Sequence, residues 1–127
     1  MDAAPKEVVR AFWRAMETND FAHAATFLSE DFVLRWPQSK ETIRGRADFA
    51  ALNAAYPANG LWRFDLRRIV ADGAEVATEV GVTDGDMAAT ALTFHEVRGG
   101  LIAAQVEYWP DPYDAPPWRA EWVSVEP

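Results

Sequence analysis

The sequence predicts an α+β fold in which helices gather on one face of a long antiparallel sheet. Three observations lead to this prediction. Apolar residues recur at helical spacing in the first 60 residues. After Gly60, four runs rich in β-branched and aromatic residues follow one another. Glycine dipeptides separate these runs, as is typical of tight hairpins. The length of 127 residues suits a single domain over residues 1–127.

The first helix is expected over residues 4–18. Asp2 is a candidate N-cap, and Pro5 falls in the first turn, where its missing N–H costs nothing. The apolar face of this helix is formed by Val8, Val9, Phe12, Trp13 and Met16.

Shorter segments follow the first helix. We expect a helix over 21–28, a strand over 31–36, a polar loop over 38–45 and a helix over 47–56. Asn19 and Asp20 end the first helix and cap the second. Pro37 stops the strand, and Pro57 stops the third helix, because proline lacks the N–H that would continue either element.

Four strands in a row make up the second half of the domain, over residues 62–71, 75–83, 87–97 and 101–109. The dipeptides between them supply the positive φ that tight turns need: Asp72-Gly73, Asp84-Gly85 and Gly99-Gly100. They predict an antiparallel meander. The tail over 110–127 is expected to wrap around the domain, with Tyr113, Trp118 and Trp122 as anchors.

Composition excludes several classes of protein. Half of the residues are hydrophobic, which excludes a disordered chain. The absence of Cys excludes disulfide scaffolds and thiolate metal sites, and a net charge of −8 gives no support to nucleic-acid binding. No apolar run reaches the roughly 20 residues of a membrane span, and the N-terminus lacks the pattern of a signal peptide. We therefore expect a soluble, cytoplasmic protein without nucleic-acid or membrane partners.

Several stretches together resemble the NTF2-like superfamily, and within it the SnoaL-like branch that includes polyketide cyclases and ketosteroid isomerases. The stretches are Val8 to Trp13, Thr18 to Asp20, Phe27 to Phe32, Trp36 to Ser39, Ile43 to Arg46 and Gly100 to Trp109. The resemblance implies a cone, with three N-terminal helices packed in the concave face of a curved, mainly antiparallel sheet. This fold carries isomerases, cyclases, hydrolases, dehydratases and non-enzymes, so it leaves the reaction open.

The resemblance also permits a check of the ketosteroid isomerase groups. Such an enzyme uses a Tyr on its first helix, an Asp base at the end of its first strand and a protonated Asp on a later strand. The corresponding positions here are Phe12, Trp36 and the neighbourhood of Leu92. None of these side chains can take the matching role. Steroid isomerisation by that mechanism is therefore excluded.

Glu107 is the candidate catalytic residue. Alternate residues of the last strand share one face, and the resemblance turns that face inward: Leu101, Ala103, Gln105, Glu107 and Trp109. Desolvation would raise the pKa of this carboxyl group and suit it to general acid–base work. The alternatives are that Glu107 pairs with an Arg such as Arg35, or lies at a solvated rim.

The two histidines are expected to have no role in the site. Thr90, Leu92, Phe94 and Glu96 are assigned to the inward face of their strand, which sends Thr93 and His95 to the outer surface or a dimer face. His23, on the short second helix, is expected to be solvated. With no third ligand nearby, we expect no metal site.

Aromatic residues are unusually abundant for so short a chain. Each alone is typical of a core, but together they suit a wall around a ring-containing ligand. The predicted ligand-binding residues are Phe12, Trp13, Trp36, Tyr56, Trp62, Phe94, Gln105 and Trp109.

Three functions remain open. The first is a small-molecule-binding domain that acts on an apolar cyclic or carbonyl-bearing ligand by proton transfer, without a cofactor. The second is a non-catalytic pocket protein, and the third is a dimeric interaction module whose cavity is filled. In all three a homodimer through the outer sheet face is expected, because the last strand is apolar on both faces and the resemblance points the same way. The residues of this strand expected on the outer face are Ile102, Ala104, Val106 and Tyr108.

Overall fold

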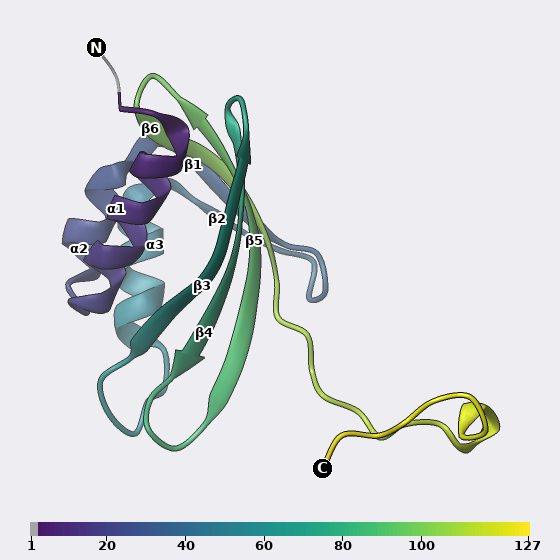
Figure 1. Cartoon of the computed structure of the whole chain (residues 1–127). Helices are drawn as coiled ribbons and strands as arrows, with labels where there is room; N and C mark the ends of the chain where they lie inside the picture. The colour runs from purple at the N-terminus through teal and green to yellow at the C-terminus, as the bar shows by residue number, and fades with distance from the viewer. Residues whose placement is uncertain (1–2) are drawn as a thin grey trace.

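The computed structural model describes residues 3–127, and it shows a curved six-stranded sheet whose concave face holds three helices (Figure 1). The strand order is β2-β1-β6-β5-β4-β3, with β1 parallel to β6 and the other neighbours antiparallel. The elements are α1 (Pro5–Glu17), α2 (Phe21–Ala24), the 3-10 turn η1 (Ala25–Phe27), β1 (Leu28–Trp36), β2 (Glu41–Arg44), α3 (Gly45–Ala55), β3 (Arg63–Asp72), β4 (Glu75–Thr83), β5 (Ala88–Arg98), β6 (Leu101–Tyr108) and the 3-10 turn η2 (Pro117–Arg119). The predicted α+β cone is confirmed.

The first helix has the expected extent and buries its apolar face against the sheet. Ala4 stands at its N-cap position without a side-chain hydrogen bond, and Asp2 lies outside the described residues. At its other end Asn19 adopts a φ of 62° and exchanges two hydrogen bonds with the backbone of Trp62, at 2.7 and 2.8 Å. Asn tolerates this left-handed conformation better than most residues. The end of α1 is thereby tied to the start of the meander.

Two segments between α1 and α3 differ from the prediction. The second helix ends as a 3-10 turn, and Leu28 begins β1 instead of ending the helix. The expected loop over 38–45 contains the short strand β2, which pairs with β1 from Trp36↔Glu41 to Val33↔Arg44. Its four residues carry a single buried apolar side chain, Ile43, so the sequence lacks the alternation that announces a strand.

The meander is confirmed in both extent and turns. Gly73, Gly85, Gly99 and Gly100 all have positive φ at the three predicted hairpins. The consecutive strands pair as neighbours from β3 to β6. Two irregularities in pairing, one in β3 and one near the end of β5, locally shift which residue faces inward.

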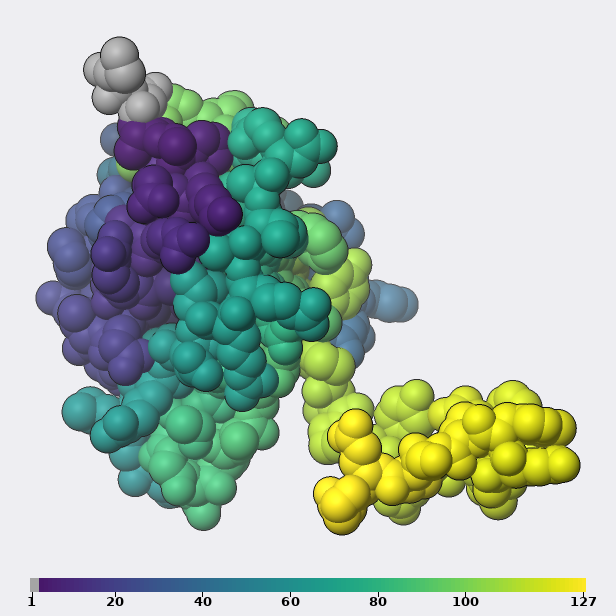
Figure 2. Space-filling view, viewed as in Figure 1, coloured from purple at the N-terminus to yellow at the C-terminus, as the bar shows by residue number. Residues whose placement is uncertain are grey.

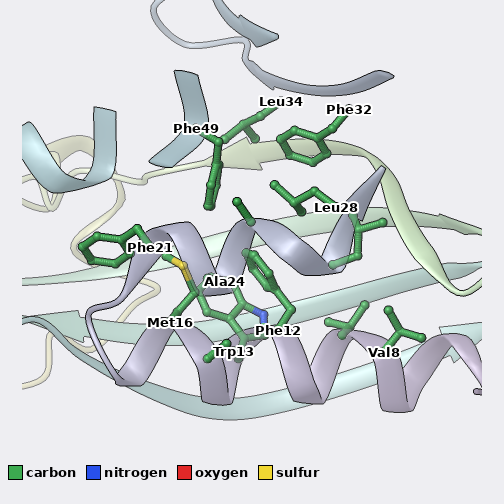
Figure 3. Close-up of a cluster of buried hydrophobic side chains, with 14 of the residues drawn as sticks. Val8, Phe12, Trp13, Met16, Phe21, Ala24, Leu28, Phe32, Leu34 and Phe49 are labelled. Carbon is green, nitrogen blue, oxygen red and sulfur yellow. The ribbon is translucent and has the colours of Figure 1, made fainter. Parts of the chain in front are cut away.

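The core lies where the helices meet the sheet (Figure 3). Phe12 is its centre, because its ring packs on Trp13 at 5.2 Å and on Phe49 at 5.9 Å between centroids. The ring of Phe32 also packs on the ring of Phe49, with 5.8 Å between their centroids. These aromatic pairs fix α1 and α3 on the sheet at spacings typical of edge-to-face packing.

The C-terminal arm, residues 110–127, does not wrap around its own domain. It leaves the end of β6 and extends away from the body (Figures 1 and 2). The three expected anchors are exposed: Tyr113 at 79%, Trp118 at 72% and Trp122 at 72%. The predicted docking of these residues is therefore wrong for the single chain. Prolines at 110, 112, 116 and 117 favour extended backbone, which holds the arm out.

The helices of residues 3–127 are all too short or too polar to cross a bilayer.

Candidate functional site

A cavity of about 650 Å³ opens between the helices and the concave face of the sheet. Such a volume is within the range of sites for small organic ligands. Most of the lining is apolar, and Met16, Leu34, Phe49 and Phe64 contribute to it. The cavity brings together Glu107 and seven of the eight predicted ligand-binding residues: Phe12, Trp13, Trp36, Tyr56, Trp62, Gln105 and Trp109.

Phe94 is the exception, and its predicted place in the cavity is wrong. Its side chain is 58% exposed on the outer face of the sheet, together with Leu92 and Glu96. Thr93 and His95 are buried on the inner face instead. A shift of one residue exchanges the two faces of a strand. The apolar residues of β5 occur on both faces, so their pattern did not determine which one faces the helices.

Glu107 is buried and accepts three hydrogen bonds. The indole nitrogens of Trp36 and Trp109 each donate to Oε1 at 3.0 Å, and the hydroxyl of Thr93 donates to Oε2 at 2.6 Å. The ion pairs within residues 3–127 involve other side chains, and Arg35, the suggested partner, is exposed. Glu107 is therefore a buried carboxyl group surrounded by neutral donors.

Burial and hydrogen bonding act on the acidity of Glu107 in opposite directions. Desolvation raises its pKa, because the charged form loses contact with water. The hydrogen bonds from Thr93, Trp36 and Trp109 favour the charged form and lower the pKa, but desolvation is the larger effect. The pKa of Glu107 is raised overall, which brings its two protonation states closer in free energy at neutral pH.

The two oxygens of Glu107 differ in their free lone pairs. A carboxylate oxygen accepts about two hydrogen bonds. Oε1 already receives two from the indoles, whereas Oε2 receives one from Thr93. A proton that Glu107 takes up or releases therefore belongs on Oε2.

A second polar group, formed by Thr78, His95 and Gln105, lies beside Glu107 on the inner face. Nε2 of Gln105 donates to Nδ1 of His95 at 2.8 Å. The other ring nitrogen of a neutral histidine then carries the hydrogen and donates to Oγ1 of Thr78, also at 2.8 Å. Burial lowers the pKa of His95 to about 3. His95 is thus a neutral side chain that holds the amide of Gln105, and the prediction of a surface His95 is wrong.

Removal of one indole donor should raise the pKa of Glu107 further. Trp36→Phe leaves Oε1 with a single indole hydrogen bond, and a hydrogen bond to a charged group contributes about 1.5–3 kcal/mol to the ionised form. Infrared titration of the carboxylic acid C=O band measures this change. Trp62→Phe also alters the cavity wall but removes no hydrogen bond from Glu107, so it is the matched control. An unchanged titration in Trp36→Phe would contradict the assigned contacts.

Among the described residues, no three His, Cys, Asp or Glu side chains lie close enough to hold a metal ion. His23 is exposed on α2, as expected, with its ring against Phe27 at 5.8 Å. The sequence did not reveal Thr78, Thr93 and His95 as buried polar partners behind the cavity-lining residues Gln105 and Glu107. Polar residues at two successive inner positions of β6, Gln105 and Glu107, are the signal that polar partners such as Thr93 and His95 face them from β5.

Comparison with known proteins agrees with this architecture. A family model described as a SnoaL-like domain matches residues 9–105. None of the curated proteins matches the chain.

Three solved structures illustrate the likeness. A Kribbella flavida protein with the provisional name ketosteroid isomerase is 32% identical, with 97% of this chain and 90% of that one covered and a TM-score of 0.88. An NTF2-like protein of unknown function from Burkholderia xenovorans is 30% identical, with 97% and 95% covered and a TM-score of 0.79. An LEH-like epoxide hydrolase of M. tuberculosis is 26% identical, with 84% and 82% covered and a TM-score of 0.68. Alignments over 97% of the chain extend into the C-terminal arm.

The family match covers most of the body, from within α1 to the middle of β6, and includes Phe12, Trp36 and Gln105 of the cavity. The fold and its open cavity are consistent with this family match. The chain belongs to the SnoaL-like domain family.

Proposed function

We propose that this domain binds an apolar cyclic, carbonyl-bearing molecule and moves a proton on it with Glu107, in a cofactor-free reaction of the isomerase, cyclase or lyase type. The observation that supports this most is a buried carboxyl group, without a cation partner, in the wall of a largely apolar cavity. Groups with strongly perturbed pKa values in a cavity are candidates for acid–base catalysis.

The proposed step is proton abstraction next to a carbonyl group. Oε2 of the Glu107 carboxylate takes a proton from the carbon beside the carbonyl, and the electron pair of the broken C–H bond moves onto the carbonyl oxygen as an enolate. Return of the proton to a different carbon completes an isomerisation. Gln105 precedes Glu107 by one inward position on β6, and its amide would orient the carbonyl oxygen. His95 keeps that amide in place.

The side chains that line the cavity indicate the class of ligand. Trp36, Trp62 and Trp109 offer flat apolar surfaces, which suit fused or substituted rings. The Trp36 and Trp109 indoles already donate to Glu107, so they would contact a ligand with their faces. A ketosteroid isomerase-like substrate is compatible with such a cavity, but the acid–base groups of that reaction are not at their usual positions. Phe12 and Trp36 replace two of them, and Leu92 faces outward with Thr93 in the inner position.

We also propose that the domain works as a homodimer through the outer sheet face. Cross-strand pairing aligns an apolar row on that face: Val70, Ala77, Phe94 and Val106 are successive register partners. Phe94 and Val70 are 58% and 63% exposed in the single chain. A row of this kind, exposed to water, is typical of an interaction surface.

Deuterium exchange tests the proton transfer without knowledge of the natural substrate. The protein is incubated in D2O with a bicyclic ketone such as 2-decalone, and NMR follows deuterium uptake at the carbons beside the carbonyl group. We expect the wild type to exceed Glu107→Gln by about 10²–10⁴-fold, the usual contribution of a positioned acid–base group. Glu30→Gln, an exposed acid on β1, is the matched control and should retain the wild-type rate.

Two other results would contradict catalysis by Glu107. Equal exchange rates in wild type and Glu107→Gln would show that another group moves the proton. Binding of the ketone without exchange, seen as line broadening of its signals, would favour the non-catalytic pocket protein.

A further inference from the structure

The C-terminal arm carries apolar side chains that its own domain leaves in water. Its large exposed residues are Tyr113, Trp118, Trp122, Val123 and Val125. Burial of one Trp or Tyr side chain removes about 150–250 Å² from water. With three of them exposed, the single chain lacks the hydrophobic stabilisation that their burial would provide. Figure 2 shows the arm standing clear of the body. Exposed apolar side chains gathered in this way are typical of an interaction surface.

The outer face of the sheet carries a groove of about 700 Å³ that could receive such side chains. Its floor includes the apolar row of Val70, Ala77, Phe94 and Val106. Three acidic residues, Asp72, Glu75 and Glu96, stand among its lining. All three are exposed, and none is in an ion pair within the described part of the chain.

Two adjacent residues of the arm, Trp118 and Arg119, present the complementary combination, while the other charged residues of the arm are acidic. Trp118 and Arg119 lie in the turn η2, with the guanidinium carbon 5.6 Å from the centre of the indole. Arg119 has no acidic partner within residues 3–127. It is the only basic residue of the arm. An aromatic ring beside a cation matches an apolar floor beside carboxylates, because the ring is buried while the charges pair at the edge.

We propose that the arm of one copy docks on a second copy of this chain, with Trp118 in the outer-face groove and Arg119 against Asp72, Glu75 and Glu96. The proline-rich start of the arm keeps it extended from its own body, which favours another molecule as the acceptor. The same contact made reciprocally gives a closed two-fold dimer.

The area is sufficient for a stable dimer. Burial of Tyr113, Trp118 and Trp122 would remove roughly 450–750 Å² of each arm from water. Two reciprocal arms would bury twice this area, and the two sheet faces that receive them would lose a comparable area. A specific interface buries about 1,200–2,000 Å² in total. The proposal rests on the homodimer proposed above and names the residues that hold it together.

The first experiment measures mass by light scattering across a dilution series, for the wild type, Trp118→Ala and a chain truncated after residue 110. We expect a wild-type dimer at micromolar concentration and at least tenfold weaker association in both variants. Glu126→Gln, an exposed acid near the end of the arm, is the matched control and should not change the association. Tryptophan emission should shift to longer wavelength on dilution of the wild type, and this shift should be smaller in Trp118→Phe.

A charge exchange then tests the partner assigned to Arg119. Arg119→Glu alone and Glu75→Arg with Glu96→Arg should each weaken the dimer, and an equimolar mixture of these two variants should recover part of the association. A dimer that survives truncation would overturn the arm contact but leave the sheet-face dimer standing. A monomer at all concentrations would overturn both. Emission that stays unchanged while the measured mass falls from dimer to monomer would show that the arm tryptophans are not buried in the dimer interface and would likewise overturn the proposal.

Discussion

Glu107→Gln should raise the melting temperature near neutral pH while it abolishes proton transfer. Gln keeps the shape of the side chain, and its oxygen can still accept from the indoles of Trp36 and Trp109 while its NH2 group donates to Thr93. The substitution removes a charge that burial makes unfavourable. A gain on the order of 1 kcal/mol, equivalent to about 3–6 °C for a domain of this size, is expected.

The effect must depend on pH with a definite sign. The folded-state pKa of Glu107 is raised above its ordinary value of 4.5, so the folded protein binds the proton more tightly than the unfolded chain does. The contribution of this group to stability is therefore fully present below pH 4.5 and is lost as pH rises through the folded-state pKa. Glu107→Gln should match or fall below the wild type at low pH and exceed it at pH 7–8.

Calorimetry of both proteins between about pH 4 and pH 8 measures this difference, with Glu30→Gln as the exposed-acid control. A Glu107→Gln variant less stable than wild type at neutral pH would mean that the hydrogen bonds to the carboxylate more than offset the cost of its desolvation. In that case Glu107 would be a structural acid, and the case for it as a proton-transfer residue would end. A more stable variant that has lost exchange activity shows the trade of stability for function typical of a working site.

The inward position of Glu107 could be predicted from the alternation along β6 together with the family resemblance. Gln105 and Glu107 alternate with Ala104 and Val106, and the inward direction came from the family resemblance. The helices and the meander were also predictable, since periodicity and the glycine turns are local signals. Such local signals give the extent of the elements and the order in which the strands pair.

The face of β5 was not predictable from the same kind of signal. Leu92 and Phe94 are its largest apolar residues, so hydrophobicity alone places them inside. The structure buries Thr93 and His95 instead, because they complete hydrogen bonds to Glu107, Gln105 and Thr78 that only the folded sheet brings within reach. Polar partners from three strands satisfy one another in the core, at the expense of a simple apolar pattern.

The arm was mispredicted for a related reason. Aromatic residues and prolines indicated a docked segment, but composition does not specify which molecule provides the surface. Trp118 and Trp122 remain exposed on the single chain. Burial of these residues by a second copy is a property of the assembly, so the residue pattern of one chain does not reveal it.

Acid should destabilise the protein through His95, in the sense opposite to Glu107. Burial lowers the folded-state pKa of His95 from 6.5 to about 3, so the unfolded chain binds the proton more tightly. The stability that comes from neutral His95 is therefore fully present above pH 6.5 and is lost as pH falls from 6.5 towards 3, at up to about 1.4 kcal/mol per pH unit. No single surface carboxylate is expected to produce so steep a change in this range.

The two opposing contributions can be separated by variants. Between pH 6.5 and 4.5 the wild type loses stability through His95 and gains it through Glu107, so its profile is flattened. Glu107→Gln removes the gain and should expose the full acid loss. Adding His95→Gln, whose amide can still reach Thr78, should remove that loss, although the lost contact to Gln105 lowers stability at every pH. Chemical denaturation of the two variants at half-unit pH steps measures both slopes. Parallel profiles for Glu107→Gln with and without His95→Gln would show that His95 does not titrate on unfolding, and the neutral, buried histidine that holds Gln105 would have to be abandoned.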